Sequence, residues 1–227
     1  MKPLPGQLAL PFDPAPRFEA GDFIEAPSNA AARRWLGCTG EWPSGRLALW
    51  GPAGCGKTHL LHGWAAAQDA DILRGGEIPA DLVPMPPDAP LAIDEADRAP
   101  ELALLHLLNS AAEAGRPVLL AARPPPGRWD TALADLASRL RAVIAIEILP
   151  AEDELLRLLL RRLLLERQLA VGEALQDYLL RRLPRTPAAL RLAAARLDRA
   201  ALAAGGRVTR GLAAAALADL LGEGEVV

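Results

Sequence analysis

The sequence predicts an α/β fold in which a parallel sheet is followed by a small helical domain. Up to residue 150, short apolar runs alternate with helical patterns. Each run is apolar throughout, as in strands that are buried on both faces of a sheet. After Pro150 no further strand-like run occurs. Strands that alternate with helices are typical of a parallel sheet covered on both faces, so we expect such a core with a domain boundary near Pro150.

Five strands and four helices are expected in this core. The first helix should begin with Ser28 as its N-cap and run through Leu36. The connection between Leu73 and Leu91 contains five prolines, which leave no room for a regular crossover helix, so we expect a shortened, loop-like crossover there. The expected strands are Leu47–Trp50, Asp71–Leu73, Leu91–Asp94, Val118–Ala122 and Val143–Ile148, and the other expected helices are Lys57–Gln68, Glu101–Ala114 and Thr131–Leu140.

The chain divides into three expected parts. Residues 1–27 carry six prolines and no helical period, and we take residues 1–17 as an extended arm. Residues 18–150 form the α/β core, and residues 151–227 form an all-helical lid whose helices are separated at glycine and proline residues. The expected lid helices are Glu152–Gln168, Glu173–Leu183, Pro187–Ala204 and Thr209–Leu221.

Composition excludes several classes of protein. The net charge is −3 and aromatic residues make up 4% of the chain, so neither wrapping of nucleic acid by bulk positive charge nor an extended base-stacking surface is expected. Two cysteines cannot build a disulfide framework, and no Cys/His spacing suits zinc. No apolar segment is long enough to cross a bilayer. We therefore expect a protein of the reducing cytoplasm that binds no membrane and contacts DNA directly little or not at all.

The strongest motif follows the first expected strand. Residues 51–58 read GPAGCGKT, which matches the phosphate-binding pattern G-x-x-x-x-G-K-[ST] between a strand and a helix. Backbone N–H groups of such a loop surround a phosphate, and the helix N-terminus adds partial positive charge. Only two of the 25 basic residues are lysines, so Lys57 stands out. The expected nucleotide-binding residues are Gly51, Pro52, Ala53, Gly54, Cys55, Gly56, Lys57 and Thr58, with the Thr58 hydroxyl as a Mg²⁺ ligand.

A second motif ends the third expected strand. Leu91–Asp97 places Asp94 and Glu95 directly after an apolar run. Asp94 is expected to hold Mg²⁺ through water, and Glu95 to polarise the attacking water. An acidic helix N-terminus is the alternative interpretation, but the position downstream of a phosphate loop favours the catalytic one.

Together these motifs resemble AAA+ ATPases, and their details resemble the DnaA family of bacterial replication initiators. The loop continues as GKTHLLHG, FIEAPSNAAA lies upstream over residues 23–32, and HLLN follows the acidic motif at residues 106–109. The resemblance covers roughly residues 18–220. It implies that ADP or ATP binds with Mg²⁺, that Phe23, Ile24 and Asn29 lie around the adenine, and that His59 belongs to the nucleotide site, chiefly as a packing residue.

The amino-terminal segment narrows the resemblance. QLALPF at residues 7–12 resembles the sliding-clamp-binding motif of the Hda proteins, short DnaA homologues that regulate the initiator. An initiator would continue into a helix-turn-helix domain, which this sequence does not contain. An extended arm with a glutamine and spaced apolar anchors suits an apolar surface pocket. The alternatives are an arm packed on its own domain and a disordered tail. The expected clamp-binding residues are Gln7, Leu8, Leu10, Pro11 and Phe12.

Three further positions follow from the resemblance. DLASRL at residues 135–140 matches the segment that holds the family's arginine finger, so Arg139 is expected to act in trans on a neighbouring subunit's γ-phosphate. The usual polar sensor at the end of the fourth strand is replaced by alanine. In the lid, Ala188 stands in the position of the sensor arginine. Arg191 lies three residues on, on the same helical face, and is expected to take its place as a nucleotide-binding residue; a solvated surface arginine is the alternative.

These features predict a regulator that tethers itself to the sliding clamp, binds adenine nucleotide and stimulates hydrolysis of ATP bound to DnaA, which prevents re-initiation. Loss of both polar sensors predicts weak ATP hydrolysis by the chain itself. A homodimer is compatible with this role. The alternatives are an autonomous ATP-driven helicase loader and a truncated DnaA-like protein that binds origin DNA.

Overall fold

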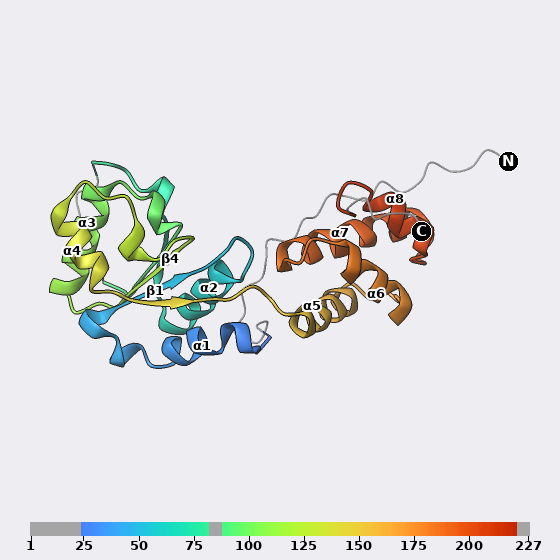
Figure 1. Ribbon diagram of the computed structural model, residues 1–227, viewed down its shortest axis with the longest axis horizontal. Helices are drawn as coiled ribbons and strands as arrows, with labels where there is room; N and C mark the ends of the chain where they lie inside the picture. The colour runs from blue at the N-terminus through green and yellow to red at the C-terminus, as the bar shows by residue number, and fades with distance from the viewer. Residues whose placement is uncertain (1–23, 82–87, 222–227) are drawn as a thin grey trace. The chain divides into compact units, whose positions relative to one another are not determined.

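The computed structural model describes residues 24–81 and 88–221, which divide into two compact units with a boundary along the chain between Pro150 and Ala151 (Figure 1). The arm residues 7–12 and Phe23 lie outside the described residues, so the predictions made for them stay predictions. None of the helices in the described ranges is long and apolar enough to span a membrane.

A five-stranded parallel sheet forms the centre of the first unit. Its order is β2-β3-β4-β1-β5, so the first strand in the chain lies between the fourth and the fifth. Arg46 pairs with Val118 of β4, and Leu47 pairs with Ile144 of β5. The strands are β1 (Arg46–Trp50), β2 (Asp71–Arg74), β3 (Leu91–Asp94), β4 (Val118–Ala122) and β5 (Ile144–Glu147).

Helices cover both faces of this sheet, because alternate residues of each buried strand point to opposite sides. On one face, Ala48, Ile93 and Leu120 pack with residues of α3 (Glu101–Glu113) and α4 (Ala134–Arg141). On the other, Leu47, Leu49 and Leu119 pack with residues of α1 (Ala30–Leu36) and α2 (Lys57–Gln68). The predicted α/β class with a doubly covered parallel sheet is therefore confirmed.

The described residues of the second unit form helices joined by short connections, without a strand, and they have their own apolar core. Leu160, Leu179, Leu190 and Leu197 are buried together with leucines and alanines from all four helices. These helices are α5 (Asp153–Glu166), α6 (Glu173–Arg182), α7 (Pro187–Ala203) and α8 (Arg210–Ala216).

Several predicted boundaries need correction. Ser28 is not the N-cap of α1: residues Pro27–Asn29 form a 3-10 turn, Asn29 occupies the cap position, and the Ser28 carbonyl accepts a hydrogen bond from the Leu149 N–H at 3.1 Å. Helix α4 begins at Ala134 rather than Thr131, because Leu133 still has extended dihedral angles. Helix α8 ends at Ala216 rather than Leu221, because Leu217 leaves the helical conformation.

Candidate functional site

The phosphate loop has the backbone shape that its glycines predict. Gly51, Gly54 and Gly56 all have positive φ, at 149°, 77° and 107°. A Cβ on Gly51 would lie 2.4 Å from the Ile148 carbonyl oxygen, so no side chain fits there. The loop then enters α2 at Lys57, with Gly56 as the N-cap. The unpaired N–H groups at a helix N-terminus are a favourable site for a phosphate.

Lys57 is folded back over this loop. Its Nζ donates hydrogen bonds to the carbonyl oxygens of Gly51 and Pro52, both at 2.8 Å, and lies 3.7 Å from the Cys55 Sγ. No carboxylate among the described residues forms an ion pair with Lys57. Its charge is therefore available to an anion that enters the loop.

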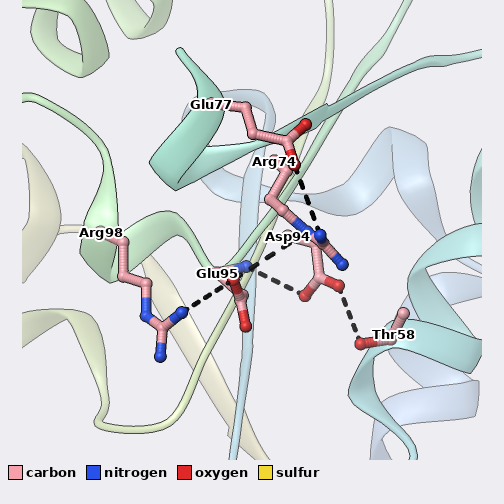
Figure 2. A network of polar contacts seen from close by, with 6 residues as sticks. All are labelled: Thr58, Arg74, Glu77, Asp94, Glu95 and Arg98. Carbon is pink, nitrogen blue, oxygen red and sulfur yellow. Dashed lines mark hydrogen bonds and ion pairs between the residues drawn. The ribbon is translucent and has the colours of Figure 1, made fainter.

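Thr58 and Asp94 meet at the carboxyl end of the sheet (Figure 2). The Thr58 hydroxyl donates to Asp94 Oδ2 at 2.8 Å, and Asp94 Oδ1 accepts the Glu95 N–H at 3.0 Å. Because the hydroxyl donates its hydrogen bond to the carboxylate, the lone pairs of Thr58 Oγ1 remain available to a cation. One hydroxyl and one carboxylate suit Mg²⁺, which keeps several waters and binds phosphate oxygens as well. The described residues contain no cluster of three or more His, Cys, Asp and Glu side chains that could hold a metal without phosphate.

Glu95 is held by two arginines (Figure 2). Its Oε2 accepts from Arg98 Nη1 at 3.1 Å and lies 4.0 Å from Arg74 Nε, while Arg74 also contacts Glu77 at 3.4 Å. Glu95 itself has the left-handed conformation, with φ 49° and ψ 41°. This carboxylate is therefore engaged in ion pairs at the position predicted for the water-activating residue.

Gly75 allows the segment after β2 to approach Glu95. A Cβ on Gly75 would lie 2.2 Å from the Glu95 carbonyl oxygen, which is far inside van der Waals contact. Only glycine permits this approach, and it brings Arg74 near the Glu95 carboxylate. Neither Gly75 nor Arg74 was predicted from the sequence, although the Gly75-Gly76 pair after a strand was a usable signal.

A cavity joins the phosphate loop to the acidic motif. It is lined by residues at the carboxyl ends of three strands, and its two arginines, Arg98 and Arg123, were not predicted from the sequence. Arg123 follows Ala122 at the end of β4, and its carbonyl accepts the Gly51 N–H at 3.2 Å. The alanine noted at the sensor position thus lies in the wall of the cavity. The lining residues are Ala53, Gly54, Lys57, Thr58, Asp94, Glu95, Asp97, Arg98, Ala122 and Arg123.

The segment expected around the adenine is ordered by Asn29. This side chain is 2% exposed; its Nδ2 donates to the Ile24 carbonyl at 3.0 Å, and its Oδ1 accepts the Ala26 N–H at 3.3 Å. Asn29 therefore fixes the shape of this segment through both ends of its amide. His59 lies in the first turn of α2 and is half-buried. Burial lowers the pKa of His62, one turn further along α2, and the charge of Asp94 partly offsets this effect.

Arg139 lies toward the opposite end of the strands from this cavity. It occupies the last turn of α4. Burial lowers the pKa of Arg46 at the amino end of β1, and the charge of Arg139 lowers it further. The phosphate loop follows the opposite, carboxyl end of the same strand. Arg139 is thus near the amino ends of the strands, whereas the chain's own phosphate loop lies at their carboxyl ends.

The predicted lid arginine, Arg191, is half-buried in α7 of the second unit. Burial lowers its pKa, and the nearby charge of Glu166 partly offsets this effect. Six other arginines among the described lid residues form ion pairs within the unit. These pairs are Arg157–Asp177, Arg161–Glu173, Arg162–Glu166, Arg167–Glu166, Arg185–Asp153 and Arg196–Asp219.

Solved structures show what this arrangement is similar to, whereas no family model matches the sequence. Domain III of the replication initiation protein DnaA from Thermotoga maritima superposes with a TM-score of 0.76 over 92% of this chain and 98% of that one, at 17% identity. The fold is that of an AAA+ domain. AMPPCP-bound DnaA from Aquifex aeolicus gives a TM-score of 0.60 at 20% identity, with 73% and 60% of the two chains covered.

The AAA+ fold is shared more widely than by initiators. The RuvB Holliday junction branch migration motor of Thermotoga maritima gives a TM-score of 0.60 at 22% identity, over 77% of this chain and 61% of that one. Identities near 20% establish the AAA+ fold, on which several different functions are built.

Proposed function

We propose that this AAA+ protein binds an adenine nucleotide with Mg²⁺ and stimulates hydrolysis of ATP held by DnaA, as Hda proteins do. The observation that carries the proposal is the position of Arg139 near the amino ends of the strands, opposite the chain's own phosphate loop. An arginine at that end of the strands is separated from its own phosphate loop by the length of β1, which supports action on a nucleotide held by a neighbouring molecule. A guanidinium supplied in trans stabilises the charge that develops on the transferred phosphoryl group.

We assign nucleotide binding in the chain's own site to the glycine loop with Lys57, and to the Thr58–Asp94 pair. Backbone N–H groups of the glycine loop hold the phosphates, and the Lys57 ammonium leaves the Gly51 and Pro52 carbonyls to neutralise them. Thr58 and Asp94 would hold Mg²⁺, which would withdraw charge from the phosphates when bound. Ile24, Asn29 and Phe23 are assigned to the adenine side of this site.

Weak hydrolysis by the chain itself follows from the surroundings of Glu95. A general base needs an available lone pair that faces water, but Arg98 and Arg74 compete for this carboxylate. Ala122 provides no polar group at the end of β4 to orient the water or the terminal phosphate. These features favour a protein that holds nucleotide as a structural ligand over an autonomous ATP-driven helicase loader.

This network makes one testable prediction. Arg98→Ala should raise the chain's intrinsic ATPase rate about tenfold, because it frees one side of the Glu95 carboxylate, and general-base catalysis is worth roughly 10²–10⁴-fold when fully established. Single-turnover hydrolysis of radiolabelled ATP measures the rate. The control is Arg128→Ala, which removes an exposed arginine outside the Glu95 network. An unchanged or lower rate in Arg98→Ala, with nucleotide affinity preserved, would show that Arg98 does not restrain Glu95.

The arm residues Gln7, Leu8, Leu10, Pro11 and Phe12 are proposed to bind the DNA polymerase sliding clamp. Binding of the arm to the clamp would bring Arg139 close to initiators near newly copied DNA. Direct DNA binding is not proposed, because six lid arginines already form ion pairs with acidic residues of their own unit. This separates the proposal from a truncated initiator that contacts origin DNA.

The experiment that tests the proposed function measures hydrolysis of DnaA-bound ATP in the presence of DNA-loaded clamp. Wild-type protein should accelerate the reaction, and the double variant Gln7→Ala, Phe12→Ala should do so only at much higher protein concentration, since tethering acts through effective concentration. Stimulation that is insensitive to the arm would contradict clamp tethering. No stimulation by the wild type, together with fast hydrolysis of its own ATP, would favour the helicase-loader alternative.

A further inference from the structure

A single carboxylate joins the helix that follows the acidic motif to the helix that carries Arg139. Glu101 is the first residue of α3, and its Oε1 and Oε2 accept the backbone N–H groups of Ala132 and Leu133 at 3.0 and 2.8 Å. Leu133 is the N-cap residue of α4, and an aliphatic side chain cannot cap a helix. Glu101 therefore supplies from another helix the acceptor and negative charge that the start of α4 lacks.

The segment between Glu95 and Glu101 is short and folded by backbone hydrogen bonds. The Arg98 N–H donates to the Glu95 carbonyl at 2.9 Å, the Ala99 N–H to the Ala96 carbonyl, and α3 then begins at Glu101. Arg98 also lines the cavity and contacts the Glu95 side chain. Because this turn is closed by hydrogen bonds, we expect a shift of the acidic motif to move the start of α3 and the Glu101 carboxylate with it.

The other end of the connection is equally well fixed. Leu136 and Leu140 of α4 are each 1% exposed and pack with α3 in one apolar cluster. Arg139 lies between them in sequence, on the half-exposed side of the helix. Close-packed interiors transmit displacements. The entry to α4, and with it Arg139, therefore follows α3.

We infer that Glu101 is a positioning residue that couples the nucleotide in this chain's own site to the placement of Arg139. The inference rests on the trans role proposed for Arg139. In this arrangement, occupation of the phosphate site orders the acidic motif, the motif orders the start of α3, and Glu101 fixes the start of α4.

Hydrogen exchange tests this coupling in the chain alone. Addition of ADP with Mg²⁺ should slow exchange of the Ala132 and Leu133 amides about tenfold in the wild type. Glu101→Gln retains one acceptor and should lose most of this response, and Glu101→Ala should lose all of it, with ADP affinity unchanged in both variants. The matched control is Glu113→Ala, which removes an exposed carboxylate from the other end of α3. Equal ADP responses in the wild type and Glu101→Ala would overturn the inference.

The DnaA assay gives a second readout that a purely structural role would not affect. Glu101→Gln should lower the maximal stimulation while leaving the concentration for half-maximal stimulation unchanged, because docking is retained and only the placement of Arg139 suffers. Combined with Arg139→Ala, it should add no further loss, as expected for residues that act through one group. If the wild type fails to stimulate DnaA but shows the Glu101-dependent exchange response, the coupling stands and the trans role fails. Additive losses would overturn the coupling.

Discussion

Replacing Arg139 with alanine should lower stimulation of DnaA-bound ATP hydrolysis by about a thousandfold, since a guanidinium supplied in trans is worth roughly 10³–10⁵ in rate in phosphoryl transfer. The fold should be unaffected, because Arg139 is half-exposed and the buried face of α4 is formed by Leu136 and Leu140. The measurement is single-turnover hydrolysis of ATP bound to DnaA, with clamp and DNA present.

Arg141→Ala is the matched control for this variant. Arg141 also lies in the last turn of α4 but is exposed two residues further on, which places it on a different side of the helix. It should retain nearly full stimulation. Equal losses in both variants would point to general loss of positive charge, and full activity of Arg139→Ala would remove the residue from the mechanism.

Replacing Lys57 with alanine should weaken ADP binding by about 100-fold, which corresponds to about 2.7 kcal/mol. The lysine contacts only carbonyl groups and a thiol in its own loop, so its charge serves no ion pair among the described residues that the fold would lose. Isothermal titration with ADP and Mg²⁺ measures the affinity. The variant should also lose most of the thermal stabilisation that ADP gives the wild type, since a ligand stabilises only the state that binds it.

The control for Lys57 is Arg116→Ala. Arg116 is exposed and precedes the amino end of β4, whereas the phosphate loop follows the carboxyl end of β1. The substitution therefore removes one positive charge at a distance from the site. Its ADP affinity should match that of the wild type. Equal weakening in both variants would show that net charge, and not the Lys57 contact, governs binding.

The sequence was sufficient to predict the sheet and the order of its helices, because buried strands and helices carry different periodicities. It was also sufficient to predict the phosphate loop, whose chemistry depends on contiguous residues. The pairing of Thr58 with Asp94 was approachable because both follow strand ends of one parallel sheet. What the residues implied for Arg139 and for the arm rested on resemblance.

The remaining site residues could not be predicted because they come from segments that only the fold brings together. Arg74 reaches Glu95 through the close approach at Gly75, and Glu101 bonds to residues 31 and 32 positions away. Ser28 has the intrinsic preference of a capping residue, yet its carbonyl is used by Leu149 and the cap falls one residue later. Tertiary hydrogen bonds decided both outcomes, and they leave no periodic trace in the sequence.

The strand order also has a consequence for synthesis on the ribosome. β1 is made early, but both of its neighbours, β4 and β5, come from residues 118–122 and 144–147. After β1 emerges, one of its sides must wait about 70 further residues for β4 and the other about 100 for β5, or about five to twenty seconds for both at ordinary elongation rates. Until β4 is made, this apolar strand has neither of its partners within its own chain. The nascent polypeptide is therefore most exposed to aggregation, and most in need of chaperones, between synthesis of β1 and synthesis of β5.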